Sequence, residues 1–211
     1  MILLNIFRKI RRNYQIKNVL KNVSSTATLL GQSHHFESQT SISLQFGARK
    51  ENVIFKTHSE IFGKIICWGN GHISIGEWVK IGFRSTINCV DRIEIGNYTA
   101  IADDVTIVDH NFHPINPSDR KYMRQTKHGS IERSPLFAAH SPIKIGENVW
   151  IGSNVRICKG VTIGDNSVIG ANSIVTKDIP SNCVAVGNPA RVVKENIDKT
   201  TVPQFPIKEM L

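Results

Sequence analysis

The sequence is poor in aromatic residues, and no two of its cysteines lie close together in the sequence. Aromatic residues make up 7% of the chain while hydrophobic residues make up 40%, so isoleucine and valine must fill most of the core. Such β-branched side chains favour β structure. The four cysteines lie far apart without a CxxC motif, which argues against a zinc knuckle: they are Cys67, Cys89, Cys158 and Cys183. We expect reduced thiols and a cytoplasmic protein.

Long apolar runs are also missing. No run approaches the roughly 20 residues that a membrane-spanning helix needs. The opening MILLNIF is too short for a signal-peptide core, and charge follows it. The net charge is +9. Acidic residues are absent from the first 24 positions, which hold Arg8, Lys9, Arg11, Arg12, Lys17 and Lys21. The basic character is therefore local, and we expect no nucleic-acid partner.

An aliphatic residue recurs every six positions along two tracts. The first tract slips by two residues and resumes, while the second is unbroken. The positions are Ile75, Ile81, Ile87, then Ile95, Ile101, Ile107, and later Ile145, Ile151, Ile157, Ile163, Ile169 and Val175. Glycine follows several of them. A period of six fits neither a 3.6-residue helix nor a sheet with long connections.

This spacing predicts a coil with three flat sides, each made of a short strand and a corner. Eighteen residues complete one coil, and stacked coils pair as parallel strands about 4.8 Å apart. The two tracts predict roughly four clear coils, and residues 42–68 add one or two degenerate ones. A β-sandwich with accidental spacing is the alternative, which six consecutive matches disfavour.

Residues 145–194 carry a family resemblance. Their sequence, IGENVWIGSNVRICKGVTIGDNSVIGANSIVTKDIPSNCVAVGNPARVVK, closely resembles the galactoside, maltose and polysaccharide O-acetyltransferases of the hexapeptide-repeat superfamily. The resemblance is good over residues 73–113 and poor before residue 70. It implies an all-β, left-handed parallel β-helix, although the usual crossover rule favours a right-handed path. It further implies a homotrimer that binds acetyl-CoA in grooves between subunits.

We divide the chain into three segments. Residues 1–40 form a basic amphipathic N-terminal segment, residues 41–188 the β-helix with a loop at 108–142, and residues 189–211 a capping segment; both end segments are expected to be partly helical. The N-terminal helix either lies on an anionic membrane surface or packs on the β-helix or a neighbouring subunit. Sedimentation with anionic liposomes, with and without residues 1–24, separates these roles.

The loop holds four of the eight histidines: His110, His113, His128 and His140. An interruption of this length in a compact domain is usually functional or disordered. The resemblance places the catalytic histidine at the start of such a loop, commonly before proline. His113-Pro114 matches that arrangement, so His113 is the expected catalytic base. His110 is the rival, and a solvated loop histidine is the plain alternative.

Imidazole suits the implied chemistry. A base with a pKa near neutrality can remove the proton of a sugar hydroxyl as that hydroxyl attacks a thioester. Backbone N–H groups would meet the oxyanion, and the imidazolium would return its proton to the CoA sulfur. The second ring nitrogen needs a partner, either a backbone carbonyl or a carboxylate such as Asp109. No cysteine lies in a context that suggests a nucleophile.

By the same resemblance, three residues would hold the acceptor. Asn88 and Asp91 lie at the two-residue slip before the loop, and their alternative role is to hydrogen-bond the corner backbone. Trp150 would line the acceptor or thioester end of the groove, or else pack in a trimer interface.

Six further positions match the cofactor-binding residues of the family: Ser153, Ala171, Thr176, Lys177, Arg191 and Lys194. Arginine offers a planar fork to phosphate oxygens. Some relatives have arginine where this chain has Lys194, which keeps the charge and loses the fork. The alternatives are residues that fill the repeat and solvated surface charges.

The sequence thus predicts acetyl transfer from acetyl-CoA to a sugar hydroxyl, in surface polysaccharide biosynthesis, with no bound metal. One rival is a zinc enzyme of the γ-carbonic-anhydrase type, which uses three histidine ligands. The other is a non-catalytic β-helix scaffold or sugar-binding module.

Overall fold

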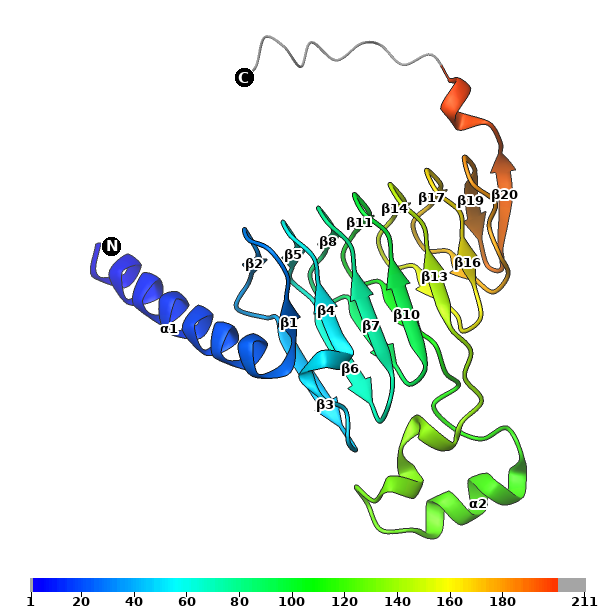
Figure 1. Cartoon of the computed structure of the whole chain (residues 1–211), viewed down its shortest axis with the longest axis horizontal. Coiled ribbons are helices and arrows are strands. Elements are labelled where there is room, and N and C mark those ends of the chain that lie inside the picture. Colours follow the sequence, from blue (N-terminus) through cyan, green and yellow to red (C-terminus); the bar gives the residue numbers. More distant parts are fainter. Residues whose placement is uncertain (1, 201–211) are drawn as a thin grey trace.

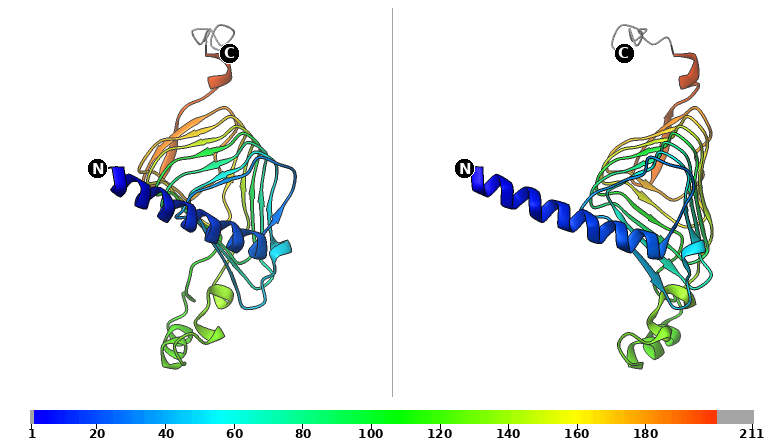
Figure 2. Two further views of the ribbon diagram at one scale, coloured as in Figure 1. Left: turned by 90° about the vertical axis from the view of Figure 1, so that its left-hand side faces the viewer. Right: turned by 60° about the vertical axis from the view of Figure 1, so that its left-hand side comes forward.

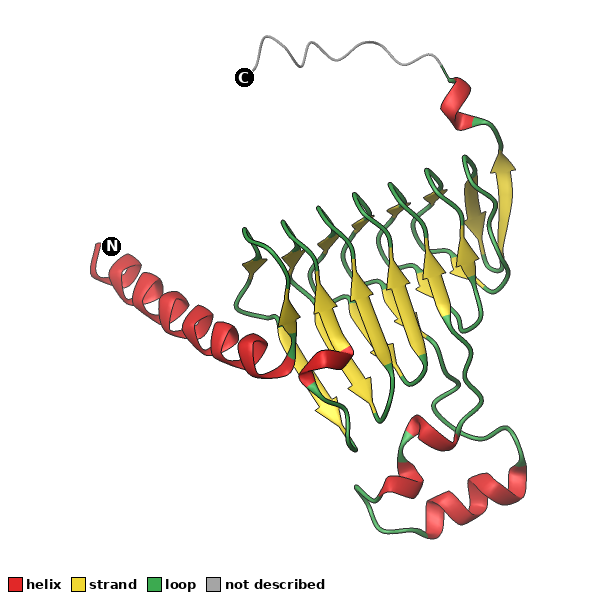
Figure 3. Ribbon diagram, viewed as in Figure 1, coloured by secondary structure: helices red, strands yellow, loops and turns green. Residues whose placement is uncertain are grey.

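The computed structural model describes the backbone of residues 2–200 and the side chains of residues 11–200. A long helix leads into a three-sided, left-handed parallel β-helix, from which one loop with short helices projects (Figure 1, Figure 3). Viewed end-on, the coils are triangular (Figure 2). The predicted fold class is confirmed.

Three parallel sheets form the faces of this triangle. Face 1 consists of β1 (Thr28–Leu29), β4 (Val53–Phe55), β7 (His72–Ile75), β10 (Arg92–Ile95), β13 (Ile143–Ile145) and β16 (Thr162–Ile163). Face 2 consists of β2 (His35–Phe36), β5 (Glu60–Ile61), β8 (Lys80–Ile81), β11 (Ala100–Ile101), β14 (Trp150–Ile151), β17 (Val168–Ile169), β19 (Val184–Gly187) and β20 (Ala190–Lys194). Face 3 consists of β3 (Ser41–Gln45), β6 (Lys64–Trp68), β9 (Thr86–Cys89), β12 (Thr106–Val108), β15 (Arg156–Ile157) and β18 (Ile174–Val175).

The repeated aliphatic residues stack on one another inside the triangle. On face 2, Ile81, Ile101, Ile151 and Ile169 stand in register from coil to coil. All four are almost completely buried. The interior is therefore a set of isoleucine and valine ladders, and the six-residue period marks the aliphatic position that recurs once on each face.

The corners combine left-handed backbone with close coil stacking. Asn148 and Asn166 have positive φ, a region that asparagine tolerates better than most residues. Their side chains are hydrogen-bonded to each other at 3.0 Å. At Gly96 a Cβ atom would lie 2.5 Å from the carbonyl carbon of Gly146 in the next coil, so this corner requires glycine.

The coils near the N-terminus are longer than those near the C-terminus. Ile81 pairs with Ile101 twenty positions on, whereas Ile151 pairs with Ile169 eighteen positions on. The extra residues lengthen the strands of face 3, which have four or five residues in β3, β6 and β9 but two in β15 and β18. The slip in the hexapeptide pattern therefore marks a wider face 3.

The β-helix begins earlier than expected. Its first strand starts at Thr28 rather than near residue 41, and β1–β3 and β4–β6 form two coils from the weakly patterned stretch. Their inward residues include Phe36 and Phe55, whose rings meet edge to face. Aromatic residues interrupt the aliphatic period here, which explains why the pattern looked degenerate.

Both ends of the β-helix are covered. Helix α1 (Ile2–Thr26) buries Val19 and Val23 against the first coil, and the Asn22 side chain bonds the backbone N–H and carbonyl of Ile42. Its N-terminal part projects away from the coils (Figure 2). No helix in residues 2–200 is long and apolar enough to cross a membrane. Peripheral membrane contact through residues 1–24 stays a prediction.

At the other end, β20 turns back and pairs antiparallel with β19, and a single 3-10 turn follows at Ile197–Lys199. This antiparallel strand, together with its loop, covers the edge of the last coil. The rest of the predicted capping segment, residues 201–211, lies outside the described residues.

The loop leaves face 3 after Val108, and the chain re-enters the β-helix on face 1 at Ile143. It contains α2 (Pro117–Gln125) and the 3-10 turns Ile131–Arg133 and Pro135–Phe137. Asn116 caps α2, because its side-chain oxygen accepts the backbone N–H of Ser118 at 2.8 Å and Pro117 begins the helix. The loop is therefore a folded element at one corner of the β-helix.

The isoleucine ladder generates a stability prediction. Ile101→Ala removes a side chain that is 2% exposed, and we expect the free energy of unfolding to fall by about 2–5 kcal/mol. The matched change Ile115→Ala, in a loop residue that is 78% exposed, should change it by at most about 0.5 kcal/mol. Denaturant unfolding of both variants checks this, and equal losses would contradict the stacked core.

Candidate functional site

The two ends of the loop are joined at its root. His110 and His140 form an antiparallel backbone bridge. Beside it the N–H of Asn111 donates to the carbonyl of Ala139 at 3.0 Å, and the N–H of Ser141 donates to the carbonyl of Asp109 at 2.9 Å. The root is therefore fixed to face 3 even though the loop is long.

Asp109 holds the neighbouring corner. Its buried carboxylate accepts the backbone N–H groups of Val90 at 2.9 Å and Asp91 at 2.8 Å. Burial raises the pKa of this carboxyl, and the two N–H donors oppose the rise. Asp109 is therefore not the carboxylate that orients the expected catalytic imidazole, because its hydrogen bonds go to the corner backbone.

His110 is a buried, fully hydrogen-bonded imidazole. Trp68 Nε1 donates to Asn88 Oδ1 at 2.7 Å, which identifies that atom as the oxygen, because indole is only a donor. His110 Nε2 lies 3.1 Å from the same oxygen and must therefore carry the proton. Its Nδ1 accepts the N–H of Phe112 at 3.0 Å.

Desolvation lowers the pKa of His110 to about 4, and His140 and Arg156 add smaller repulsive contributions. A second proton on His110, at Nδ1, would also place two N–H donors against each other, because the N–H of Phe112 points at that nitrogen. His110 is thus neutral near pH 7, and neither of its nitrogens has a free lone pair.

The two predicted acceptor residues of the slip, Asn88 and Asp91, both lie under the loop root. Asn88 is buried on β9, and its oxygen serves Trp68 and His110, which leaves its amide N–H groups for any ligand. Asp91 Oδ2 lies within hydrogen-bond distance, 3.1 Å, of His140 Nδ1 in a half-exposed contact. The structure therefore brings Asn88 together with His110, and Asp91 together with His140.

His113, the expected base, is exposed one turn beyond His110. Its backbone N–H donates to the carbonyl of Asn111 at 2.8 Å. Its side chain lines a cavity of about 340 Å³ between the loop and the wide part of face 3, beside Phe46, Trp68 and Arg124. The imidazole is therefore accessible, as a group that must meet substrate has to be.

A second cavity, of about 380 Å³, lies on the other side of the loop root. Its lining includes His110, Phe112, Arg156 and the predicted cofactor residue Thr176. Lys177 follows Thr176 at the same corner and is exposed.

The other predicted cofactor residues lie at two further places. Ser153 and Ala171 are exposed one coil apart at the corner between faces 2 and 3, where the N–H of Asn172 donates to the carbonyl of Ser153 at 2.9 Å. Arg191 and Lys194 lie on β20 at the C-terminal end. The six residues thus border the C-terminal coils and are not gathered around one cavity.

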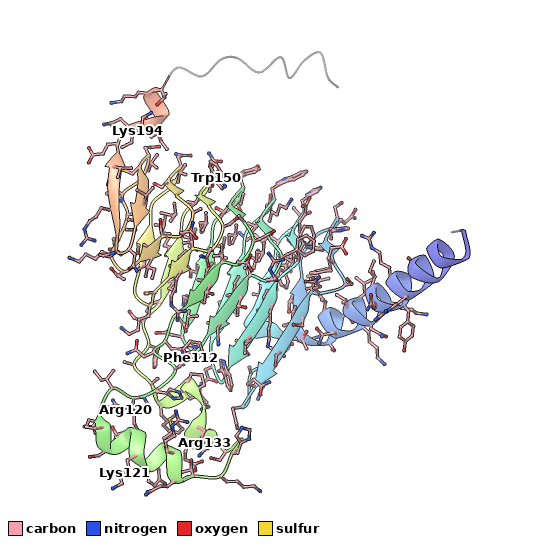
Figure 4. The ribbon with its side chains drawn as sticks, turned by 180° about the vertical axis from the view of Figure 1, so that it is seen from behind. Phe112, Arg120, Lys121, Arg133, Trp150 and Lys194 are labelled. Carbon is pink, nitrogen blue, oxygen red and sulfur yellow. The ribbon has the colours of Figure 1, made fainter. Side chains whose placement is uncertain are left out.

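Trp150 does not join the loop within one chain. It is 59% exposed at the start of β14, and Figure 4 shows it at the edge of the β-helix opposite the loop, which holds Phe112 and Arg133. Sequence reasoning also missed Trp68, whose indole fixes Asn88. Its only signal was an unusual tryptophan at the end of the degenerate repeat IICW.

Among residues 11–200, no three His, Cys, Asp or Glu side chains are placed so that they could hold a metal ion together.

A hexapeptide β-helix with a histidine-bearing loop at one corner is typical of a class of transferases. Comparison with known proteins supports membership of this class. Residues 142–177 match the family model described as bacterial transferase hexapeptide (six repeats). The chain is 45% identical over 128 residues to a galactoside O-acetyltransferase of Escherichia coli K12, covering 61% of this chain and 56% of that protein.

Solved structures extend the similarity. A galactoside acetyltransferase in complex with coenzyme A is 34% identical, with a TM-score of 0.55, covering 84% of this chain and 69% of that one. The polySia-specific acetyltransferase NeuO is 29% identical, with a TM-score of 0.59 and 85% coverage of each chain. The chain belongs to the hexapeptide-repeat acetyltransferases. It spans somewhat more than half the length of the curated relatives it matches first.

The burial of neutral His110 generates a pH prediction. Its pKa in the folded protein, about 4, lies below the ordinary value of 6.5, so the unfolded chain takes up the proton first as the pH falls. This residue should therefore lower the free energy of unfolding between about pH 6.5 and 4. We expect His110→Gln to flatten that part of the pH dependence, as measured by denaturant unfolding across this range. An unchanged slope would contradict the buried neutral tautomer.

Proposed function

We propose that the chain transfers the acetyl group of acetyl-CoA to a hydroxyl group of a saccharide, with His113 as the general base. The observation that carries the proposal is the accessible imidazole of His113 in a cavity at the loop root of a hexapeptide β-helix. The similarity to the galactoside and polySia acetyltransferases supports the substrate class. The structure of the galactoside enzyme with coenzyme A supports the donor.

In this mechanism His113 removes the proton of the acceptor hydroxyl while the oxygen attacks the thioester carbonyl. A carbon–oxygen bond forms and a tetrahedral oxyanion develops, which N–H donors stabilise. The amide N–H groups of Asn88, whose oxygen alone is engaged by Trp68 and His110, would supply one such donor. The carbon–sulfur bond then breaks, and the imidazolium protonates the departing thiolate. Atoms and charge balance without an acyl-enzyme.

The remaining predicted residues divide between the two substrates. Asp91 would bind acceptor hydroxyls beside Asn88. The pantetheine arm of CoA would run past Ser153, Ala171 and Thr176, along the corners that border face 3. Its phosphates would be bound by the exposed cations Lys177, Arg191 and Lys194. These assignments follow the family resemblance, and the exposure of all six side chains is compatible with them.

We infer a homotrimer in which two subunits complete each site. Trp150 lies on the opposite side of the β-helix from the loop of its own chain, so it can meet His113 only across a subunit interface (Figure 4). A heterologous contact that closes into a ring brings two different surfaces together in this way. Trp78 and Tyr98, at equivalent corners of successive coils, are also half exposed and offer apolar area to such an interface.

We infer that the reaction takes place in the cytoplasm. All four cysteines are free thiols, which is the state that a reducing compartment maintains. The similarity to a polysialic acid O-acetyltransferase of Escherichia coli, 37% over 142 residues, supports a role in surface polysaccharide biosynthesis.

Replacing His113 tests the base. We expect His113→Ala to lower kcat by roughly 10²- to 10⁴-fold, since general-base assistance is worth that much, with little change in KM for acetyl-CoA. Free-thiol release with saccharide acceptors is the measurement. Should His113→Ala retain full activity while His110→Gln abolishes it without unfolding the chain, the base assignment is wrong.

Mixing two inactive variants tests the shared site. His113→Ala and Trp150→Ala should each be inactive as homotrimers. After random mixing at equal amounts, about one quarter of the interfaces would pair an intact His113 with an intact Trp150, so about one quarter of the activity should return. Co-expression with two affinity tags and a thiol-release assay provide the measurement. Absence of recovery in verified mixed trimers would place both residues in one chain's site.

A further inference from the structure

We propose that the acceptor is an anionic saccharide and that Arg124 binds its carboxylate in the cavity that His113 lines. The inference rests on the proposed acetyl transfer and adds the chemical class of the acceptor. It is drawn from the aromatic floor of the cavity, the charge of its walls and the fold of the loop above it.

The floor of the cavity is a pair of stacked aromatic rings. Phe46 and Trp68 lie 5.9 Å apart between centroids, with 15° between their planes. The indole N–H of Trp68 is already bound to Asn88, so its ring orientation is fixed from below. A flat, rigid apolar floor with a few polar groups at its rim is typical of small-molecule sites and suits the C–H face of a sugar ring.

The walls of the cavity carry positive charge and no carboxylate. Two arginines, Arg124 and Arg133, line it, and neither aspartate nor glutamate does. The loop between residues 116 and 134 holds five Arg or Lys residues against Asp119 and Glu132. A concave site lined by charges of one sign concentrates ligands of the opposite sign.

The two arginines have different roles. Arg133 Nε and Nη2 donate to the carbonyls of Met123 and Arg124 at 3.1 and 2.6 Å, so Arg133 caps the C-terminal end of α2. Arg124 is exposed, and among residues 11–200 it has no ion pair or side-chain hydrogen bond. Its planar fork is therefore available to a carboxylate, which it can bind with two parallel hydrogen bonds.

A carboxylate held by Arg124 would orient the sugar ring. With the ring on Phe46 and Trp68, a hydroxyl of the same or the next residue would face His113 at the rim. Binding at a group that does not react then positions the hydroxyl that does. The transfer step itself is unchanged: the hydroxyl loses its proton to His113 and the thiolate receives it.

A matched pair of acceptors tests the proposal. The first is an oligosaccharide that contains a uronic acid, and the second is the same oligosaccharide after reduction of its carboxylates to alcohols. We expect kcat/KM for the acid to exceed that for the neutral form by about tenfold or more, as one charge-assisted bidentate contact allows. Arg124→Gln should bring the ratio close to one and leave KM for acetyl-CoA unchanged. The ratio should also shrink as ionic strength rises.

Lys121→Gln is the control variant. It removes one positive charge from the exposed surface of α2 without touching the cavity lining (Figure 4). The preference for the acid should survive in this variant. If Lys121→Gln reduces the ratio of kcat/KM for the acid and neutral acceptors as much as Arg124→Gln does, the general positive charge of the loop explains the preference. The assigned contact between Arg124 and the carboxylate is then wrong.

The remaining outcomes separate this inference from the proposed function. Equal turnover of the acid and neutral acceptors overturns the inference and leaves acetyl transfer standing. A phosphorylated oligosaccharide that outcompetes the uronic acid overturns the carboxylate assignment. If no acceptor is acetylated, the proposed function fails, and calorimetry without acetyl-CoA decides the inference. In that case the inference requires that the acid bind with a lower Kd than its reduced form. It also requires that this difference in Kd disappear in Arg124→Gln.

Discussion

The register between stacked coils is the constraint on which the rest of the structure depends. Backbone hydrogen bonds join each strand to the same strand of the next coil, and inward isoleucines such as Ile87 and Ile107 can stack only in that register. Face 3 thereby places Ile66, Asn88 and Val108 in one row. The row ends where the chain leaves the β-helix. The stacking of the apolar core therefore fixes the positions of the polar residues at the loop root.

The coils could be predicted from the sequence because the six-residue repeat of aliphatic residues also sets the register between neighbouring coils. An inward isoleucine every six residues specifies both the strand and its partner, as Ile151 and Ile169 show. The width of face 3 could not be predicted, since an eight-residue interval between Ile87 and Ile95 does not say which strand receives the extra residues. The contact between Trp68 and Asn88 depends on that width, and it was missed for this reason.

Two histidines three residues apart were hard to rank by sequence, and their backbone explains the difference between them. Phe112 has φ of +63°, a conformation that few aromatic residues adopt. This turn directs the N–H of Phe112 back to His110 Nδ1 and sends His113 outward to the cavity. A single left-handed residue thus separates a buried imidazole from an accessible one, and such a conformation is set by surrounding structure rather than by local sequence.

A base needs a free lone pair, and this requirement favours the outer histidine. His110 has one nitrogen protonated toward Asn88 and the other engaged by a backbone N–H, so its use as a base would require the turn at Phe112 to open. Opening would leave the backbone N–H of Phe112 without its partner, while Nε2 would stay bound to the oxygen that Trp68 also contacts. The buried network is therefore better suited to fixing the loop than to moving protons. The proposed general base, His113, lies instead at the rim of a cavity, where its imidazole is exposed.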